Sequence, residues 1–596
     1  MEINDSHTYA KPDAAVITHL DLDIEVDFDT HLIHGTATYS IDNKSRGSQI
    51  ILDTRDMDIL GVTRDGGMKT DWTLGDDDEF MGRSLTISIE PDTKNISIEY
   101  KTHPEAAGVQ WLDPQQTAGK KHPFLFTQSE AILARTWIPI QDSPGIRFSY
   151  NAKVKVPKGL LALMSASNPQ EVDPDGQYDF TMKQPIPSYL MALAIGHIVF
   201  RSEGPRTGVY AEPEIIEKAA WEFGEMEDML TTAESLYDPY RWDRYDLIVL
   251  PPSFPFGGME NPRLTFATPT VIAGDRSLTA LVAHELAHSW SGNLVTNANW
   301  NDFWLNEGFT VYFERRITEA LKGKAYAEML AQLGYQDLVD ETARLSKEGK
   351  SADTHLKLQL DGRDPDDGMT DIAYEKGYAL LRHIEKVVGR ETWDAFLKQY
   401  FNTHAFQSMT TEAFLDYAEQ YLINGNDSLR QALNMNQWIY ETGIPDDIDI
   451  PHSDVFVKVE QSITDWQNGT NLEALPVSTW SSHEWQHFLR KMPDSLSLSE
   501  MNQLDAAYHF SKSGNSEILA LWLGLAIKHE YEPAYPVLDS FLVNVGRRKF
   551  LMPLYSALIK TGKGMQMALE IYKKARPNYH SVSYNSVDEL LDWNPE

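Results

Sequence analysis

The first 204 residues contain short runs in which apolar and polar side chains alternate. Between Leu20 and Phe28, apolar residues take every second position and acidic residues take the positions between them. This period of two is typical of a β-strand with one solvent-exposed face. The alternation returns from Ile33 to Ile41 after a short turn, so the two runs predict a hairpin. Similar runs, separated by Gly, Pro, Asn and Asp, are Leu85–Ile89, Ile96–Tyr100, Phe148–Val156 and Leu190–Phe200. We therefore predict a β-rich N-terminal domain over residues 1–204.

Beyond about residue 213, apolar positions recur at the spacing of a helix face. The helix-length segments of this kind are Ile215–Tyr237, Leu278–Trp290, Phe303–Leu321, Tyr326–Leu345 and Ala373–Val388. They predict a mostly helical second domain over residues 205–449.

A Pro- and Asp-rich stretch, Pro445–Asp454, predicts a linker. Beyond it lie the helix-length segments Ser497–Ser511, opened by a capping box of Ser497 and Glu500, and Ser516–Lys528. They predict an all-helical C-terminal domain over residues 450–596. The chain is thus expected to be a multidomain α+β protein, in keeping with 596 residues at roughly 150 residues per domain.

The charge balance narrows the range of partners. Lys and Arg number 52 and Asp and Glu number 88, which gives a net charge of −36. This charge repels phosphate backbones and anionic lipid surfaces, so we expect neither nucleic acid nor a membrane as partner. A hydrophobic fraction of 42% excludes disorder throughout the chain.

The chain has no cysteine, which excludes disulfides, thiolate catalysis and iron–sulfur clusters. Any metal must therefore bind to His, Asp or Glu. The segment Met1–Asp13 is polar and acidic and does not resemble a secretory signal. The longest apolar run, Tyr189–Phe200, is too short to span a bilayer. We expect a cytoplasmic protein, with removal of an export leader from a longer precursor left open.

The richest candidate for chemistry is a His-Glu-x-x-His pattern formed by His284, Glu285 and His288. On a helix, residues four apart lie on one face, so both imidazoles can reach one zinc ion. Glu285 lies beside the metal, where it can take a proton from a water molecule. The alternative is two histidines that pair with acids on a solvated helix face.

A third candidate ligand, Glu307, follows His288 after eighteen intervening residues and lies on the next helical segment. Two histidines and one glutamate leave the fourth zinc position for water, as in catalytic sites. Upstream, Gly257 and Gly258 would let the backbone approach a ligand closely, and Glu260 can bind a cation.

Taken together, these motifs resemble those of the zinc aminopeptidases of the aminopeptidase N superfamily (family M1), and more closely those of the leukotriene A4 hydrolase branch. The resemblance covers essentially the whole chain. Further stretches that carry it are Gln110–Thr117, His122–Gln128, Pro251–Pro262, Gly292–Asn297, Tyr374–Gly377 and Gly546–Phe550. It implies a thermolysin-like catalytic domain and three domains placed around a deep cleft.

The resemblance also implies roles for individual residues. One zinc ion per chain would bind to His284, His288 and Glu307, with Glu285 as the general base and Tyr374 as the donor that stabilises the oxyanion. Glu260 would bind the free amino group of the substrate. Further substrate-binding residues implied in this way are Gln128, Glu130, Gly257, Gly258, Met259, Asn261, Asp366, Arg547 and Lys549.

Arg547 and Lys549 match a basic pair that binds the carboxylate of short peptides. Asp366 matches an aspartate implicated in epoxide hydrolysis, but Met369 stands where the animal enzymes carry a tyrosine, and Glu130 stands where the leukotriene-hydrolysing enzymes carry a glutamine. We therefore expect a monomeric aminopeptidase that acts on short peptides with a free N-terminus. Two alternatives remain: hydrolysis of a lipid epoxide in the same site, and a non-catalytic peptide-binding scaffold.

Overall fold

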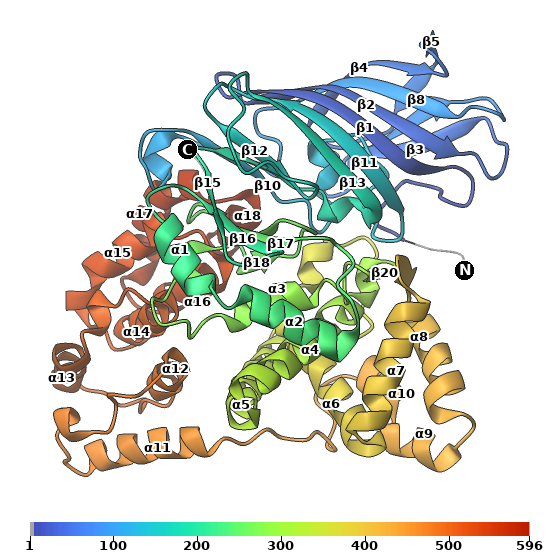
Figure 1. Ribbon diagram of the computed structural model, residues 1–596. Helices are drawn as coiled ribbons and strands as arrows, with labels where there is room; N and C mark the ends of the chain where they lie inside the picture. Colours follow the sequence, from blue (N-terminus) through green and yellow to red (C-terminus); the bar gives the residue numbers. More distant parts are fainter. Residues whose placement is uncertain (1–4, 595–596) are drawn as a thin grey trace.

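The computed structural model describes residues 5–594, and its N-terminal region is built mainly from β-sheets (Figure 1). A seven-stranded sheet has the order β13-β11-β1-β2-β8-β4-β5. Its strands are β1 (Val16–Asp27), β2 (Leu32–Asp42), β4 (Met57–Arg64), β5 (Met68–Lys69), β8 (Asn95–Thr102), β11 (Arg147–Lys155) and β13 (Gln177–Pro187). A three-stranded sheet comprises β3 (Gln49–Thr54), β7 (Arg83–Ser88) and β6 (Trp72–Leu74).

The predicted hairpin forms between β1 and β2. The two strands are antiparallel, and Leu20 pairs with Tyr39 in their register. Leu20, Leu22 and Ile24 are at most 2% exposed, whereas the acidic residues between them face outward. The alternation therefore identified the buried face because the strand has one wet side.

A four-stranded sheet leads towards the middle of the molecule. It has the order β12-β14-β10-β9. Its strands are β9 (Val109–Leu112), β10 (Phe124–Thr127), β12 (Leu161–Met164) and β14 (Leu193–Gly196). Strand β10 is buried along its whole length and delivers Gln128 and Glu130 directly beyond its last residue.

A five-stranded sheet with the order β15-β16-β17-β19-β18 begins the second region. Its strands are β15 (Val199–Ser202), β16 (Thr207–Ala211), β17 (Tyr245–Val249), β18 (Gly258–Met259) and β19 (Thr265–Ala267). The run Leu190–Phe200, expected as one strand, is divided between β14 and β15, which belong to different sheets. The predicted boundary at residue 204 falls between β15 and β16, which pair with each other in one sheet. The domain boundaries at residues 204 and 449 therefore stay predictions.

Helices pack beneath this sheet. The long buried helix α4 (Trp304–Lys322) contacts α3 (Ala280–Ala287), α5 (Lys324–Lys347) and α6 (Gly377–Val388). The remaining helices of the region are α1 (Ile216–Phe223), α2 (Met226–Tyr237), α7 (Arg390–Thr403), α8 (Thr411–Ala418), α9 (Asp427–Leu433) and α10 (Met435–Tyr440). The small sheet β20 (Val295–Asn297) and β21 (Gln407–Met409) joins two loops of the region.

Two predicted helices differ from the structure in their details. The segment Ile215–Tyr237 is broken at Gly224 and Glu225 into α1 and α2. The segment Ala373–Val388 begins as a π-helix, Ile372–Lys376, before it continues as α6. Both differences are changes in local winding, which hydrophobic periodicity does not report.

The C-terminal region is all-helical, as predicted. Its helices are α11 (Asp454–Gln467), α12 (Ser482–Arg490), α13 (Leu498–Tyr508), α14 (Ser516–Lys528), α15 (Tyr535–Asn544), α16 (Arg548–Leu558), α17 (Gly564–Ala575) and α18 (Ser581–Leu591). The Ser497 and Glu500 capping box is present, and α14 has the predicted bounds. Met329 and Leu333 of α5 contribute to the apolar core of this region.

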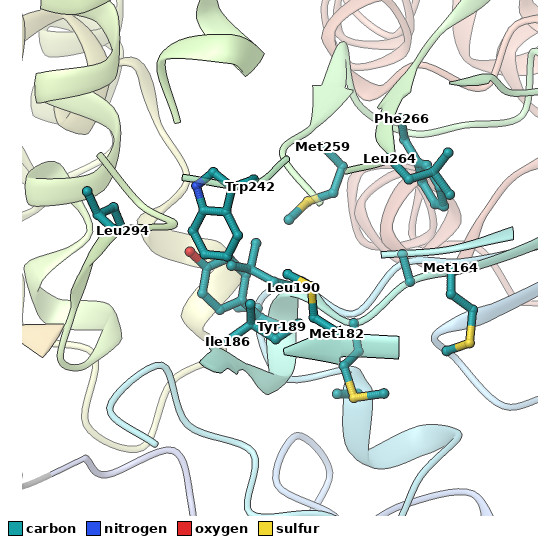
Figure 2. Packing of buried hydrophobic residues seen from close by; sticks show 14 of the residues in the cluster. Met164, Met182, Ile186, Tyr189, Leu190, Trp242, Met259, Leu264, Phe266 and Leu294 are labelled. Atoms are coloured by element: carbon teal, nitrogen blue, oxygen red, sulfur yellow. The ribbon is translucent and has the colours of Figure 1, made fainter. Parts of the chain in front are cut away.

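The three regions are in contact with one another. Ile186, Tyr189 and Leu190 of the N-terminal region share one apolar cluster with Trp242 and Met259 of the second region (Figure 2). The C-terminal helices, orange to red in Figure 1, lie against both. Within residues 5–594, no helix is both long enough and apolar enough to cross a lipid bilayer.

Candidate active site

His284 and His288 present their ring nitrogens to each other at the end of α3. The two Nε2 atoms are 3.2 Å apart, and the rings are inclined at 81°. The Nδ1 atoms are occupied on the opposite sides: His284 Nδ1 lies 3.1 Å from Glu314 Oε2, and His288 Nδ1 lies 3.1 Å from the carbonyl oxygen of Ser291. Fixing Nδ1 in this way leaves Nε2 free to bind a metal.

Glu307, in the first turn of α4, completes the group. Its Oε2 lies 3.2 Å from His284 Nε2 and 3.6 Å from His288 Nε2. This oxygen is buried and has no hydrogen-bond partner. One ligand atom from each of the three residues lies within 4.8 Å of the others. Two opposed imidazole nitrogens and an unpartnered carboxylate oxygen fit a zinc ion better than they fit a hydrogen-bond network.

The Glu285 carboxylate lies against Gly258 of β18 with very little space between them. A Cβ atom on Gly258 of β18 would lie 2.1 Å from Glu285 Oε1, so only glycine leaves room for this carboxylate. Burial raises the pKa of Glu285 well above its ordinary value, and the charges of Glu260 and Glu307 raise it further. A cation bound among these groups would lower the pKa again.

Glu260 is held next to the His284, His288 and Glu307 group by two asparagines. Asn293 Nδ2 donates to the Glu260 carbonyl oxygen at 2.7 Å, and Asn306 Nδ2 lies 3.4 Å from Glu260 Oε1. Oxygen or nitrogen ligand atoms of Glu260, Glu285 and His288 also lie within 4.8 Å of one another. The carboxylate expected to bind an amino group is therefore adjacent to the candidate metal ligands.

Gln128 and Glu130 reach the same place from the end of β10. Gln128 Nε2 lies 3.3 Å from Met259 Sδ, while Gln128 Oε1 and Glu130 Oε1 are buried without a hydrogen-bond partner. Burial raises the pKa of Glu130 well above its ordinary value, and the negative charge of Glu260 is the next cause. Unpartnered acceptors and accumulated negative charge make this corner a receptor for a cationic hydrogen-bond donor.

Tyr374 approaches the site from the π-helix. Its hydroxyl lies near the Glu307 carboxylate, and its ring stacks near that of His284 with 6.1 Å between ring centroids. Burial and the charge of Glu307 raise the pKa of Tyr374, so the phenol stays protonated and can donate.

Arg547 and Lys549 share one carboxylate partner, Glu517 of α14. Arg547 Nη1 lies 3.2 Å from Glu517 Oε1, and Lys549 Nζ lies 3.0 Å from both Glu517 oxygens. Although burial opposes it, the charges of Lys549 and Arg547 lower the pKa of Glu517 to about 2. A Cβ atom on Gly257 would lie 2.8 Å from Arg547 Nη2, so the guanidinium borders the residue that precedes β18.

Asp366 lies beside Glu130, one of the residues expected to bind the amino group of the substrate. It belongs to the short helical turn Pro365–Gly368 and lies near the backbone N–H of Ala131, the neighbour of Glu130. Burial, together with the charge of Asp364, raises the pKa of Asp366 to about 7. Met369 packs against the main apolar core.

The structure thus brings together the expected metal, base and amine-site residues. Asn261 is buried close by in the chain, and its Nδ2 has no hydrogen-bond partner. Sequence reasoning missed Glu314, Asn306 and Glu517. Glu314 was accessible from the pattern, because it lies seven residues after Glu307 and so on the same face of α4.

A histidine pair on one helix, a glutamate from the next helix and a carboxylate-lined amine corner define a metallopeptidase of the aminopeptidase class. Sequence comparison is in agreement. Models of the peptidase M1 N-terminal domain, the peptidase family M1 domain and the C-terminal domain of leukotriene A4 hydrolase match residues 16–190, 221–438 and 480–591. The chain belongs to peptidase family M1, the zinc aminopeptidases.

Individual relatives are similar over most of their length. Leukotriene A-4 hydrolase of Xenopus laevis is 36% identical over 97% of this chain and 98% of its own. Aminopeptidase B of Rattus norvegicus is 39% identical over 82% of this chain and 77% of its own. The structure of yeast LTA4 hydrolase in complex with bestatin superposes with a TM-score of 0.89 and 32% identity, over 99% of this chain and 97% of that one.

Proposed function

We propose that this enzyme removes the N-terminal residue from short peptides, with one zinc ion held by His284, His288 and Glu307. The observation that carries the proposal is the placement of two buried carboxylates, Glu130 and Glu260, next to these three ligands. An acidic corner beside the reaction centre favours a substrate with a free ammonium group.

Zinc at this position would acidify a water molecule and polarise the substrate carbonyl. Glu285 takes the proton from the attacking water and passes it to the nitrogen of the leaving amine. The hydroxyl of Tyr374 donates to the oxygen that gains negative charge during the attack. Because Gly258 has no side chain, the Glu285 carboxylate has room to lie beside β18, in a position that favours the proton transfer.

Glu130 and Glu260 bind the substrate ammonium and so measure the distance from the N-terminus to the scissile bond. Gln128 Oε1 supplies a third acceptor. Because an ammonium has three donors, this set of acceptors matches it. Cleavage is therefore restricted to the first peptide bond.

Arg547 and Lys549 bind the carboxylate at the other end of a short peptide. They carry two positive charges against the single charge of Glu517, so a substrate carboxylate would balance the cluster.

Two features of the sequence support a monomer in the cytoplasm. The net charge of −36 disfavours self-association, and a chain without cysteine has no need of an oxidising compartment.

The test compares an aminoacyl p-nitroanilide with its N-acetylated analogue. We expect hydrolysis of the free amine and a loss of about 100-fold or more for the acetylated compound, because charge-assisted hydrogen bonds contribute about 1.5–3 kcal/mol each. A chelator should abolish activity and zinc should restore it. Equal turnover of both compounds would remove the amine-recognition role of Glu130 and Glu260.

A second candidate activity is hydrolysis of a lipid epoxide in the same site. Asp366 favours it, since its carboxylate lies within the site next to the Glu130–Ala131 peptide. An epoxide that disappears with purified enzyme, and persists with Asp366→Asn, would support this activity. Retained peptidase activity without epoxide consumption would discard it.

A further inference from the structure

Tyr374 is carried by a π-helix, Ile372–Lys376, at the start of α6. A single π-turn is less favourable than the α-helix that follows it, so neighbouring contacts have to hold it in place. The direction of the Tyr374 hydroxyl depends on this turn, because a change in winding rotates every side chain that it carries.

Two contacts fasten the π-helix and the first residue of α6 to α4. Gly377 packs backbone to backbone against Gly308, the residue after Glu307: a Cβ atom on Gly377 would lie 2.7 Å from Gly308 Cα. Glu375 forms an ion pair with Arg315 at 2.7 Å. These contacts fix the side of the turn that faces Glu307.

Lys376 is a third contact and connects the turn to a different part of the chain. Its side chain is buried, and its Nζ donates to the carbonyl oxygens of Thr354 at 2.7 Å and Glu441 at 3.0 Å. These acceptors belong to segments that are joined to each other, since the Gly443 N–H donates to Thr354 Oγ1 at 2.7 Å. The lysine therefore ends at two chain segments, around Thr354 and around Glu441, that are hydrogen-bonded to each other; we call this pair of segments the anchor.

The buried ammonium carries a cost. Its hydrogen-bond partners are neutral main-chain carbonyls, and burial lowers the pKa of Lys376 to about 7. An apolar side chain would avoid most of the desolvation penalty of a cation. The lysine, unlike an apolar side chain, makes directional hydrogen bonds that connect the π-helix to the anchor.

We propose that Lys376 is a positioning residue for Tyr374: by tying the π-helix to Thr354 and Glu441, it aims the phenol hydroxyl at Glu307 and the reaction centre. This inference rests on the proposed role of Tyr374 in peptide hydrolysis. The Lys376 side chain is buried with its Nζ on the Thr354 and Glu441 carbonyls, so it acts through the direction of a neighbouring side chain.

A double-mutant cycle tests the proposal. With an aminoacyl p-nitroanilide, Lys376→Met should lower kcat about 10- to 100-fold and change KM by less than about 2-fold, since small displacements of a positioned group have effects of this size. In a Tyr374→Phe background, Lys376→Met should cause little further loss, because the group that it positions is already gone. An equal loss in both backgrounds, or an unchanged kcat in the wild-type background, would overturn the proposal.

A binding measurement separates this inference from the catalytic proposal. A phosphonate analogue of a dipeptide mimics the tetrahedral oxyanion, and Lys376→Met should weaken its binding about 10-fold only where Tyr374 is present. Unaltered affinity would contradict the inference whether or not the enzyme cleaves the anilide, whereas absence of cleavage by the wild-type enzyme would contradict the proposed function alone.

Arg382→Met is the matched control. It removes a partly buried cation from the following α6, where Arg382 pairs with Glu328 and Asp449, and leaves the π-helix contacts in place. We expect a similar loss of thermal stability with kcat within about 2-fold of wild type. Should Lys376→Met fail to fold, Lys376→Gln, which keeps one donor group, replaces it with the same expected pattern at a smaller amplitude.

Discussion

Gly258 and Glu285 share one small space in the molecule. The alpha carbon of the glycine lies so near the glutamate that a methyl group on it would be 2.1 Å from Oε1 and 2.3 Å from Cδ. The glycine is thus part of the wall that holds the proposed general base.

Gly258→Ala should therefore reduce activity through Glu285. The atom in the way is the end of a side chain, so the carboxylate moves while the fold persists. We expect kcat/KM to fall about 100-fold, as for other displacements of a positioned group, with a modest change in melting temperature. The control is Gly524→Ala in α14, where an added Cβ meets nothing within 4 Å. Wild-type kinetics for Gly258→Ala would show that Glu285 has room to spare.

Glu285→Gln should abolish proton transfer while leaving the metal ligands unchanged. Because general acid–base catalysis contributes about 10²- to 10⁴-fold, we expect a loss of this size in kcat with near-normal zinc content. Zinc content by atomic absorption and steady-state kinetics provide the two readouts. A variant that retains full turnover would make Glu285 dispensable and favour another base.

Glu517 should set the affinity for peptides with a free C-terminus. Glu517→Gln keeps the shape of the side chain but removes the charge that Arg547 and Lys549 now share. We expect KM for a free-acid tripeptide to fall about 3- to 10-fold, a change of about 1 kcal/mol, while KM for the C-terminal amide stays constant.

The KM values for the free-acid tripeptide and for its C-terminal amide can also contradict the proposed role of Glu517. A rise in KM for the acid would mean that Glu517 positions the two cations rather than competing with the substrate. Arg547→Met supplies the opposite control, since loss of the buried cation should raise KM for the acid and leave the amide unaffected.

His580 makes the junction between the N-terminal and C-terminal regions sensitive to acid. Its ring stacks on Phe126 of β10, and burial lowers its pKa from 6.5 to about 3. The unfolded chain takes up a proton below about pH 6.5 and the folded chain does not until about pH 3, so the stabilising contribution is present above pH 6.5 and is lost as the pH falls.

Urea unfolding at pH 7 and pH 5 measures this effect. The wild-type protein should lose about 2 kcal/mol between pH 7 and pH 5 from this histidine alone, because the full slope of about 1.4 kcal/mol per pH unit is reached only below about pH 6.5. His580→Asn retains an N-cap acceptor for α18 and removes the titrating ring, so its pH dependence should be shallower. Parallel pH profiles for the two proteins would exclude His580 as the cause.

The sequence contained enough to place the local features of this fold and site. The β1–β2 hairpin follows from a period of two, and the facing of His284 and His288 follows from helix geometry, because both depend on residues close together in the chain. Glu307 could be paired with them since α4 is the next α-helix after α3 and packs against it. The family resemblance supplied the assignments of Tyr374, Arg547 and Lys549.

Features that depend on winding or on distant partners were out of reach. Neither the π-helix at Tyr374 nor the break between α1 and α2 leaves a mark in hydrophobic spacing. Glu517 precedes Arg547 by thirty residues, and the two meet only when α14 packs against α16. A run such as Leu190–Phe200 reads as continuous although the chain changes sheets within it.

The loop that carries Arg547 is attached to the catalytic region through main-chain atoms. The N–H groups of Gly546 and Arg548 donate to the carbonyls of Pro252 and Pro255, and a Cβ atom on Gly546 would lie 2.7 Å from the carbonyl oxygen of Ser253. Attachment of this kind is indifferent to most side chains on either loop. Substitution of side chains on these loops should therefore leave Arg547 at its distance from the proposed zinc site, so that the proposed selection for peptide length can change independently of the preference for peptide side chains.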